Sequence, residues 1–134
     1  MKPIKLTKKQ FIDEGAFAKV YRISPRRIVK VFKDQDNEEY GRNLQDEIAG
    51  SKMHEACLPI LKVVEVILPN SRRSRKALLK RYIPYEVSEG EFYKKYNPHN
   101  YSIFWDIKRR NIRKDSKGRI YLIDTQTHAC MDLN

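Results

Sequence analysis

The sequence contains little cysteine, and its cysteines are not arranged to build a structure. Cys57 and Cys130 are the only two. Neither lies in a Cys-x-x-Cys pair or at metal-ligand spacing from a histidine, so we expect both to be thiols. A disulfide framework or a cysteine-based metal site is therefore excluded as the basis of the fold.

The sequence also lacks long hydrophobic runs. Its basic start, MKPIKLTKKQ, is not followed by the apolar stretch of a signal peptide, and no later segment is long and apolar enough to span a membrane. We expect no membrane span and a cytoplasmic location. Delivery to a host cytosol without a cleaved signal peptide, or an origin as a fragment of a longer toxin, stays open.

What the sequence has in excess is positive charge. Lys and Arg number 28 against 17 Asp and Glu, which makes a formal net charge of +11. Such a charge attracts polyanions, among them nucleotides, nucleic acid, anionic membranes and acidic proteins, or it only keeps a small protein in solution. The densest basic stretches are Arg72, Arg73, Arg75, Lys76, Lys80 and Arg81, and then Lys108, Arg109, Arg110, Arg113, Lys114, Lys117 and Arg119.

Length and pattern predict a single α+β domain. The chain of 134 residues is long enough to bury a core, and its 40% hydrophobic and 10% aromatic residues argue against disorder. We find no internal repeat and no low-complexity linker. Apolar alternation, helical spacing and turn residues predict strands within 11–23 and at 27–33, a helix over 37–57, strands at 61–68 and 76–83, a short helix within 86–97, a turn at 115–118 and a strand at 119–123.

A group of polar residues late in the chain points to phosphoryl transfer. Asp106, Lys108 and Asn111 form the pattern Asp-x-Lys-x-x-Asn, and Asp124 follows after the predicted turn and strand. A carboxylate can orient an acceptor hydroxyl and take its proton, and a lysine can neutralise a migrating phosphoryl group. Hard oxygen donors from an asparagine and an aspartate can hold magnesium. The spacing therefore fits transfer from a nucleoside triphosphate bound with magnesium.

This stretch resembles the catalytic loop and the metal-binding DFG segment of the protein kinase superfamily. The resemblance makes Asp106 the catalytic aspartate and Lys108 its companion lysine, as in kinases of the Ser/Thr type. It makes Asn111 and Asp124 the residues that bind Mg²⁺, and it implies ATP as the phosphoryl donor.

Upstream motifs lie in the same order as in that family. EGAFAKVY, residues 14–21, resembles the glycine-rich phosphate loop, with Gly15 at its middle glycine, Phe17 at its aromatic tip and Val20 where the family covers the adenine. IVKVFK, which follows it, resembles the third-strand motif, and this makes Lys30 the lysine that reaches the α and β phosphates.

The remaining landmarks concern the helix and the hinge. The resemblance makes Glu47 the ion-pair partner of Lys30, although Glu38, Glu39 and Glu55 are rivals for this role. It makes Tyr82 and Ile83 part of the hinge that binds adenine through backbone groups. Over about residues 10–127 it implies a kinase-like fold, in which a five-stranded antiparallel N-lobe sheet with one helix (about 1–83) precedes a reduced C-lobe (84–134).

The sequence departs from the family pattern at the DFG segment and at the phosphate loop. Thr125 and Gln126 stand in place of the phenylalanine and glycine of DFG, which puts the in and out flip of that segment in question. Asp13 and Ala18 stand at the outer glycines of the phosphate loop. There a carboxylate could repel phosphate, and a non-glycine residue would cost about 1 kcal/mol if a positive φ were needed.

The sequence ends soon after Thr127, without the activation segment or the large helices of a C-lobe. We therefore expect a reduced C-lobe, as in the miniature kinases found among bacterial effectors and toxins, some of which need a host partner.

Two functions follow from different classes. The first is an ATP-dependent protein kinase acting on Ser or Thr, with an acidic or host protein docking on the basic surface. The alternative is a pseudokinase-like module that binds nucleotide and a partner without turnover. A small-molecule kinase is less favoured because Lys108 is present. Nucleic-acid binding is open but not favoured, because the aromatic residues are not interleaved with the basic clusters.

Overall fold

A computed structural model describes residues 2–33, 38–97 and 111–126 of the chain. The chain divides into two compact units, one made of Met1–Leu44 and Ile60–Tyr82 and the other of Gln45–Pro59 and Ile83–Asn134. Strands and helices occur in both, so the predicted α+β class is confirmed. The predicted lobes, with their boundary near residue 83, stay a prediction.

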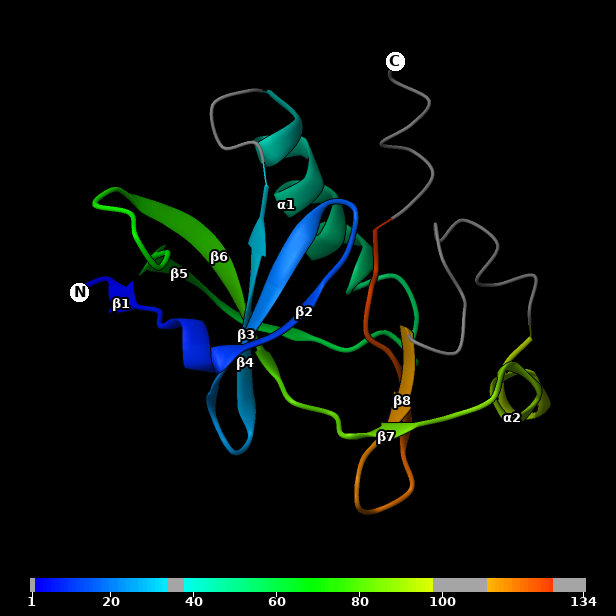
Figure 1. The fold of residues 1–134 in the computed structure, drawn as a ribbon. Helices are drawn as coiled ribbons and strands as arrows, with labels where there is room; N and C mark the ends of the chain where they lie inside the picture. The colour runs from blue at the N-terminus through cyan, green and yellow to red at the C-terminus, as the bar shows by residue number, and fades with distance from the viewer. Residues whose placement is uncertain (1, 34–37, 98–110, 127–134) are drawn as a thin grey trace. The chain divides into compact units, whose positions relative to one another are not determined.

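The first unit contains a sheet of six strands in the order β1-β5-β6-β4-β3-β2 (Figure 1). All the strands predicted for this part of the chain are present. The strands are β1 (Ile4–Lys5), β2 (Phe11–Glu14), β3 (Ala18–Ser24), β4 (Arg27–Phe32), β5 (Ile60–Ile67) and β6 (Ser74–Arg81), and a 3-10 turn, η1 (Lys8–Gln10), follows β1.

The prediction of five antiparallel strands is wrong in the number of strands and in the direction of one of them. The extra strand, β1, pairs parallel to β5 with Ile4 opposite Val66, and the N–H of Leu6 donates to the carbonyl of Ile67 at 2.9 Å. A strand of two residues is too short to show alternation, so the sequence pattern contained no signal for it. The sheet is therefore mixed.

The two faces of this sheet differ in composition. One face forms a hydrophobic cluster in which Val29 and Val31 of β4 pack with residues of the other strands. The opposite face contains Lys30 and Phe32, because side chains alternate along a strand. The buried members of the cluster are Leu6, Tyr21, Val29, Val31, Val64, Val66 and Ala77.

Helix α1 (Glu38–Gly50) contains the boundary between the two units, which falls between Leu44 and Gln45. The prediction extended this helix to Cys57, and that end is wrong. Beyond Gly50 the N–H of Lys52 donates to Ala49 at 3.2 Å, and Cys57 instead forms an isolated bridge with Leu122. Because the backbone around Cys57 finds its partners in a distant strand, local helical spacing did not decide its structure.

The second unit is built on a three-stranded sheet in the order β7-β8-β9. The strands are β7 (Tyr85–Glu86), β8 (Ile112–Lys114) and β9 (Ile120–Leu122), and a short helix, α2 (Glu89–Lys95), follows β7 (Figure 1). The predicted final strand and short helix are thus confirmed. The hydroxyl of Ser88 caps α2 by accepting from the N–H of Glu91 at 3.1 Å.

The core of the second unit surrounds Phe92 of α2, which is fully buried. Because this ring lies among residues of β8, β9 and the segment after α1, its burial holds the short helix in place. The buried members of this cluster are Ala56, Cys57, Val87, Phe92, Ile112, Ile120 and Leu122, and Cys57 is present as a buried thiol. In the described part of the chain no helix is long and apolar enough to cross a membrane.

Candidate active site

A hairpin in the second unit places the two predicted magnesium ligands at the same end of its strands. β8 and β9 pair antiparallel with Ile112 opposite Leu122, and the N–H of Ile123 donates to the carbonyl of Asn111 at 2.9 Å. Asn111 therefore precedes β8 and Asp124 follows β9 at the same end of the hairpin. Both residues are half-buried.

The turn at the other end of the hairpin explains this register. The N–H of Asp115 donates to the carbonyl of Arg119 at 3.0 Å, and one oxygen of its carboxylate accepts from the N–H groups of Lys117 and Arg119 at 3.0 and 2.9 Å. Gly118 has φ +83°, a conformation that glycine adopts without strain. The predicted turn thus sets the pairing that brings Asn111 toward Asp124.

The backbone after Asp124 is tied down by two hydrogen bonds. The Oδ1 atom of Asp124 accepts from the N–H of Gln126 at 3.1 Å. Thr125 is fully buried, and its Oγ1 donates to the carbonyl of Glu47 in α1 at 2.8 Å. Thr125, the residue predicted to stand in place of the phenylalanine of DFG, is therefore held by a polar contact.

Asp106 and Lys108, the predicted catalytic pair, lie outside the described residues, so their roles stay predictions. Within the described residues no group of three or more His, Cys, Asp and Glu side chains is placed to hold a metal ion. An amide oxygen from Asn111 and a carboxylate from Asp124 are nevertheless the hard donors that Mg²⁺ prefers, and a magnesium site with few protein ligands relies on water and phosphate for the rest. The chemistry of these two residues fits such a site.

In the first unit, Lys30 lies near the centre of the sheet. It is opposite Val20 on β3 and opposite Leu78 on β6, and its side chain is only 8% exposed. Its Nζ lies 5.3 Å from the centre of the Phe32 ring. The structure thus places Val20 and Lys30, both assigned to nucleotide binding, as direct neighbours on one face.

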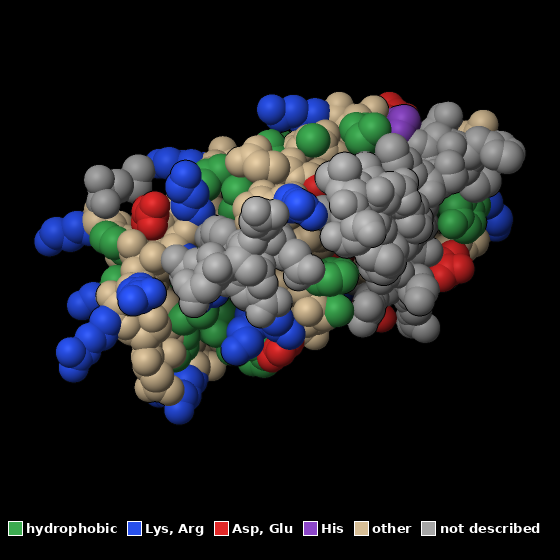
Figure 2. Space-filling view, turned by 90° about the horizontal axis from the view of Figure 1, so that it is seen from above, with side chains coloured by type: hydrophobic (Ala, Val, Ile, Leu, Met, Phe, Trp, Pro, Cys, Tyr) green, Lys and Arg blue, Asp and Glu red, His purple; other side chains and the backbone are tan. Residues whose placement is uncertain are grey.

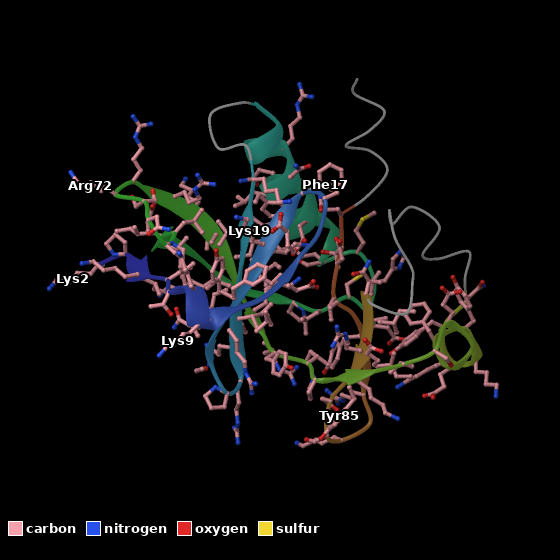
Figure 3. All side chains as sticks on the ribbon, in the orientation of Figure 1. Lys2, Lys9, Phe17, Lys19, Arg72 and Tyr85 are labelled. Carbon is pink, nitrogen blue, oxygen red and sulfur yellow. The ribbon has the colours of Figure 1, made fainter. Side chains whose placement is uncertain are left out.

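The predicted phosphate loop is the tip of the β2–β3 hairpin. The N–H of Gly15 donates to the carbonyl of Ala18 at 2.9 Å, and the carbonyl of Gly15 accepts from the Lys33 ammonium at 2.8 Å. Figure 3 shows Phe17 near this tip, and its ring is exposed. Asp13 and Ala18 lie within β2 and β3, and among the described residues only Asn70 and Gly118 have a positive φ. Asp13 and Ala18 therefore do not have the positive φ that would strain a non-glycine residue.

The tip also contains charge. Glu14 forms an ion pair with Lys33, with 2.6 Å between Oε2 and Nζ. This hydrogen-bonded lysine lowers the pKa of Glu14, so its carboxylate is ionised at neutral pH. Asp13 beside it is exposed. Two carboxylates thus stand next to the glycine predicted to face phosphate.

Glu47 in α1 is fully buried, whereas its rival Glu55 is exposed. Burial makes Glu47 the better candidate for a charge-pairing role, because a buried carboxylate is retained only where it is paired or hydrogen-bonded. Lys30 belongs to the first unit and Glu47 to the second, and an ion pair between them stays a prediction. The side chains of Glu38 and Glu39 are not described.

The two predicted hinge residues have different surroundings. The N–H of Tyr82 donates to the carbonyl of Arg26 at 2.8 Å, and its ring lies 4.3 Å from the Arg22 guanidinium carbon. Ile83 is buried in the second unit against Leu58 and Tyr121. A base bound at Tyr82 would therefore need backbone groups other than this N–H.

Sequence reasoning missed Lys80, which it assigned to a basic surface cluster. Lys80 is 1% exposed, whereas Arg72, Arg73 and Lys76 are exposed as expected. The available signal was its alternation phase on β6, two residues after the buried Leu78. Lysines are rarely buried this completely unless they are paired.

Exposed cations are nevertheless frequent on the first unit. Lysine and arginine side chains stand out at the left of the surface in Figure 2. Figure 3 labels Lys2, Lys9 and Arg72 on this unit, and all of them are exposed. Of the predicted basic stretches, Arg72, Arg73, Lys76, Lys117 and Arg119 are exposed, whereas Arg75, Arg81, Arg113 and Lys114 are half-buried and Lys80 is buried.

No protein-family model matches this chain, and no curated protein matches it. The resemblance to protein kinases therefore depends on the motifs and their order. Of the predicted residues, the structure places Asn111 and Asp124 at one end of a hairpin in one unit and pairs Val20 with Lys30 in the other.

Proposed function

We propose that the protein is an ATP-dependent phosphotransferase that acts on Ser or Thr of a protein, with a reduced kinase-like fold. The observation that carries the proposal is the β8–β9 hairpin, since it places an asparagine and an aspartate at one end, where both could serve as magnesium ligands. The order of the motifs along the chain is the second support.

Each residue has one task in this proposal. Lys30 binds phosphate as a cation on an apolar sheet face, where a charge acts more strongly than in water. Asp106 orients the acceptor hydroxyl and takes its proton, and Lys108 neutralises charge on the transferred group. Asn111 and Asp124 hold Mg²⁺, which supplies charge neutralisation at the phosphates.

The test is incubation of the purified protein with γ-labelled ATP and Mg²⁺, with and without a bacterial or eukaryotic lysate. We expect label in a protein band with the unaltered chain and none with Asp106→Ala or Asp124→Ala. Circular dichroism should show that both variants fold. Label that persists in a folded Asp106→Ala or Asp124→Ala variant would refute the assigned roles.

A nucleotide-binding module without turnover is the second candidate, and the acidic hairpin tip favours it. The exposed carboxylates of Asp13 and Glu14 lie beside Gly15, where they would oppose the approach of a triphosphate. ATP with Mg²⁺ would then raise the melting temperature while no protein in any lysate is labelled. Asp13→Asn should strengthen nucleotide binding under either candidate.

The basic surface of the first unit is proposed to dock an acidic protein. Its exposed cations Lys2, Lys5, Lys8, Lys9, Arg72 and Arg73 would attract a negatively charged partner, and salt would screen the attraction. Binding of polyglutamate should weaken as salt is raised and should weaken further in an Arg72→Glu, Arg73→Glu variant. Equal binding at low and high salt would exclude this docking mode.

A further inference from the structure

Two buried lysines share one face of the first unit's sheet. Lys30 on β4 is opposite Leu78, and Lys80 on β6 is opposite Ile28. Residues directly opposite in an antiparallel pair have side chains on the same face, so Lys30 and Lys80 are diagonal neighbours there, roughly 7–8 Å apart at the backbone. Their side chains are 8% and 1% exposed.

The residues paired directly with the two lysines are apolar: Val20 and Leu78 lie opposite Lys30, and Ile28 and Ile60 lie opposite Lys80. Phe32 and Leu78 are fully buried, Ala18 is buried opposite Phe32, and the Lys30 ammonium lies near the Phe32 ring. Removing an ammonium group from water is costly unless it is paired or hydrogen-bonded, and a second one of the same sign nearby adds repulsion. Hydrophobic side chains of similar length would fill the same space without this cost. A pair of lysines is thus an arrangement that core packing alone does not favour.

Of the two lysines on β6, only Lys80 is buried. Lys76 lies four residues earlier on β6, in the same alternation phase, and it is exposed beside Glu65 of β5. A lysine with this phase on β6 can therefore remain in water. Lys80 instead lies one residue before the end of β6, diagonal to Lys30, the residue assigned to phosphate binding.

We propose that Lys80 is a second cation of the phosphate-binding face, so that this face takes a ligand with at least two phosphates. The inference rests on the proposed function, since Lys30 is the phosphate lysine there. An ammonium group is donor-only, with three N–H groups, and is a compact charge that suits a phosphate oxygen. Two such groups on one face favour a diphosphate or triphosphate over a neutral nucleoside, because each added charge is then matched.

The test compares Lys80→Met with Lys76→Met, a matched variant that also loses one positive charge from the same strand. The dissociation constants of ADP with Mg²⁺ and of pyrophosphate are measured by calorimetry, and adenosine binding is measured by ligand-observed NMR. Lys80→Met should weaken ADP and pyrophosphate binding about tenfold or more and leave adenosine unchanged. Lys76→Met should change all three by about twofold or less. Lys80→Arg should restore most of the affinity.

Two results would overturn the inference. Unchanged ADP binding in a folded Lys80→Met would make Lys80 a structural residue, and an equal loss for adenosine and ADP would mean that it acts on the shape of the site or on the base. Thermal melting shows whether each variant is folded, and Lys80→Arg provides a charged variant if Lys80→Met is not.

A Lys30→Met variant separates this inference from the proposed function. If Lys30→Met weakens ADP binding and Lys80→Met does not, only the inference about Lys80 fails. If the unaltered protein binds neither ADP nor pyrophosphate, the nucleotide site fails as well.

Discussion

The hydroxyl of Thr125 donates to the backbone carbonyl of Glu47 at 2.8 Å, across 78 positions of sequence. The same carbonyl also accepts from the N–H of Ser51 at 2.9 Å. Thr125 directly follows Asp124, so this bond ties the segment that contains a proposed metal ligand to the last turns of α1 within the second unit. Thr125 is therefore a polar anchor in this chain, at the position that the predicted resemblance to protein kinases aligns with the phenylalanine of DFG.

Replacing Thr125 with valine removes the hydroxyl at nearly constant volume. We expect the free energy of unfolding to fall by roughly 0.5–1.5 kcal/mol, because Ser51 still donates to the Glu47 carbonyl and no acceptor is left unsatisfied. Urea denaturation measures the change, and Thr125→Ser, which keeps the hydroxyl, should lose less. A stability equal to that of the unaltered protein would show that the bond contributes nothing.

Asp124→Asn tests the metal role separately from the fold. The variant keeps the side-chain shape but loses the charge, so we expect the Mg²⁺-dependent part of the thermal stabilisation by ATP to disappear. Asp115→Asn is the matched control, because it removes one carboxylate from the same hairpin and keeps an oxygen that can accept from Lys117 and Arg119. If both variants respond to Mg²⁺ as the unaltered protein does, Asp124 is not a ligand.

Gly118→Ala should destabilise the hairpin. Gly118 has φ +83°, where a Cβ atom costs roughly 1–2 kcal/mol although no neighbouring atom would clash with it. Gly41→Ala is the opposite case, since Gly41 lies in α1 with open space around it, and alanine should stabilise that helix by about 1 kcal/mol. Thermal denaturation of the two variants should therefore shift in opposite directions, and shifts of the same sign would contradict this account.

Tyr21 should make stability depend on pH in the alkaline range. Burial raises the pKa of the Tyr21 phenol, Glu14 raises it further, and Arg75 opposes the effect. The folded state then keeps its proton at a pH where the unfolded state, with a pKa of about 10, has lost it. The contribution of Tyr21 is thus complete below that pH and is lost as the pH rises through the higher folded value.

The measurement is the difference in unfolding free energy between the unaltered protein and Tyr21→Phe across this range. The other tyrosines and the lysines cancel in the comparison. As the pH rises past about 10, the unfolding free energy of the unaltered protein should fall relative to that of Tyr21→Phe. A constant difference would mean that Tyr21 titrates alike in both states.

The sequence predicted the elements that have a local signal. Alternation marked β3 and β4, the turn residues Asp115 to Gly118 and the strand β9 after them were expected, and Ser88 capped a short helix where one was expected, whereas the three-residue strand β8 was not predicted. Two-residue strands such as β1 and β7 have no period of their own. They form because a distant strand offers free backbone groups, and that is decided only when the chain folds.

The sequence by itself determined which residue types are present and in what order: a glycine hairpin, a lysine on an apolar strand, and an asparagine and an aspartate on either side of a turn. The tertiary structure decided where they lie. Strand register set Asn111 and Asp124 at the same end of the β8–β9 hairpin and placed Lys80 on the face of Lys30 rather than at the surface. The physical reason is that a register shift of one residue moves every side chain of a strand to the other face, and pairing with distant strands determines the register.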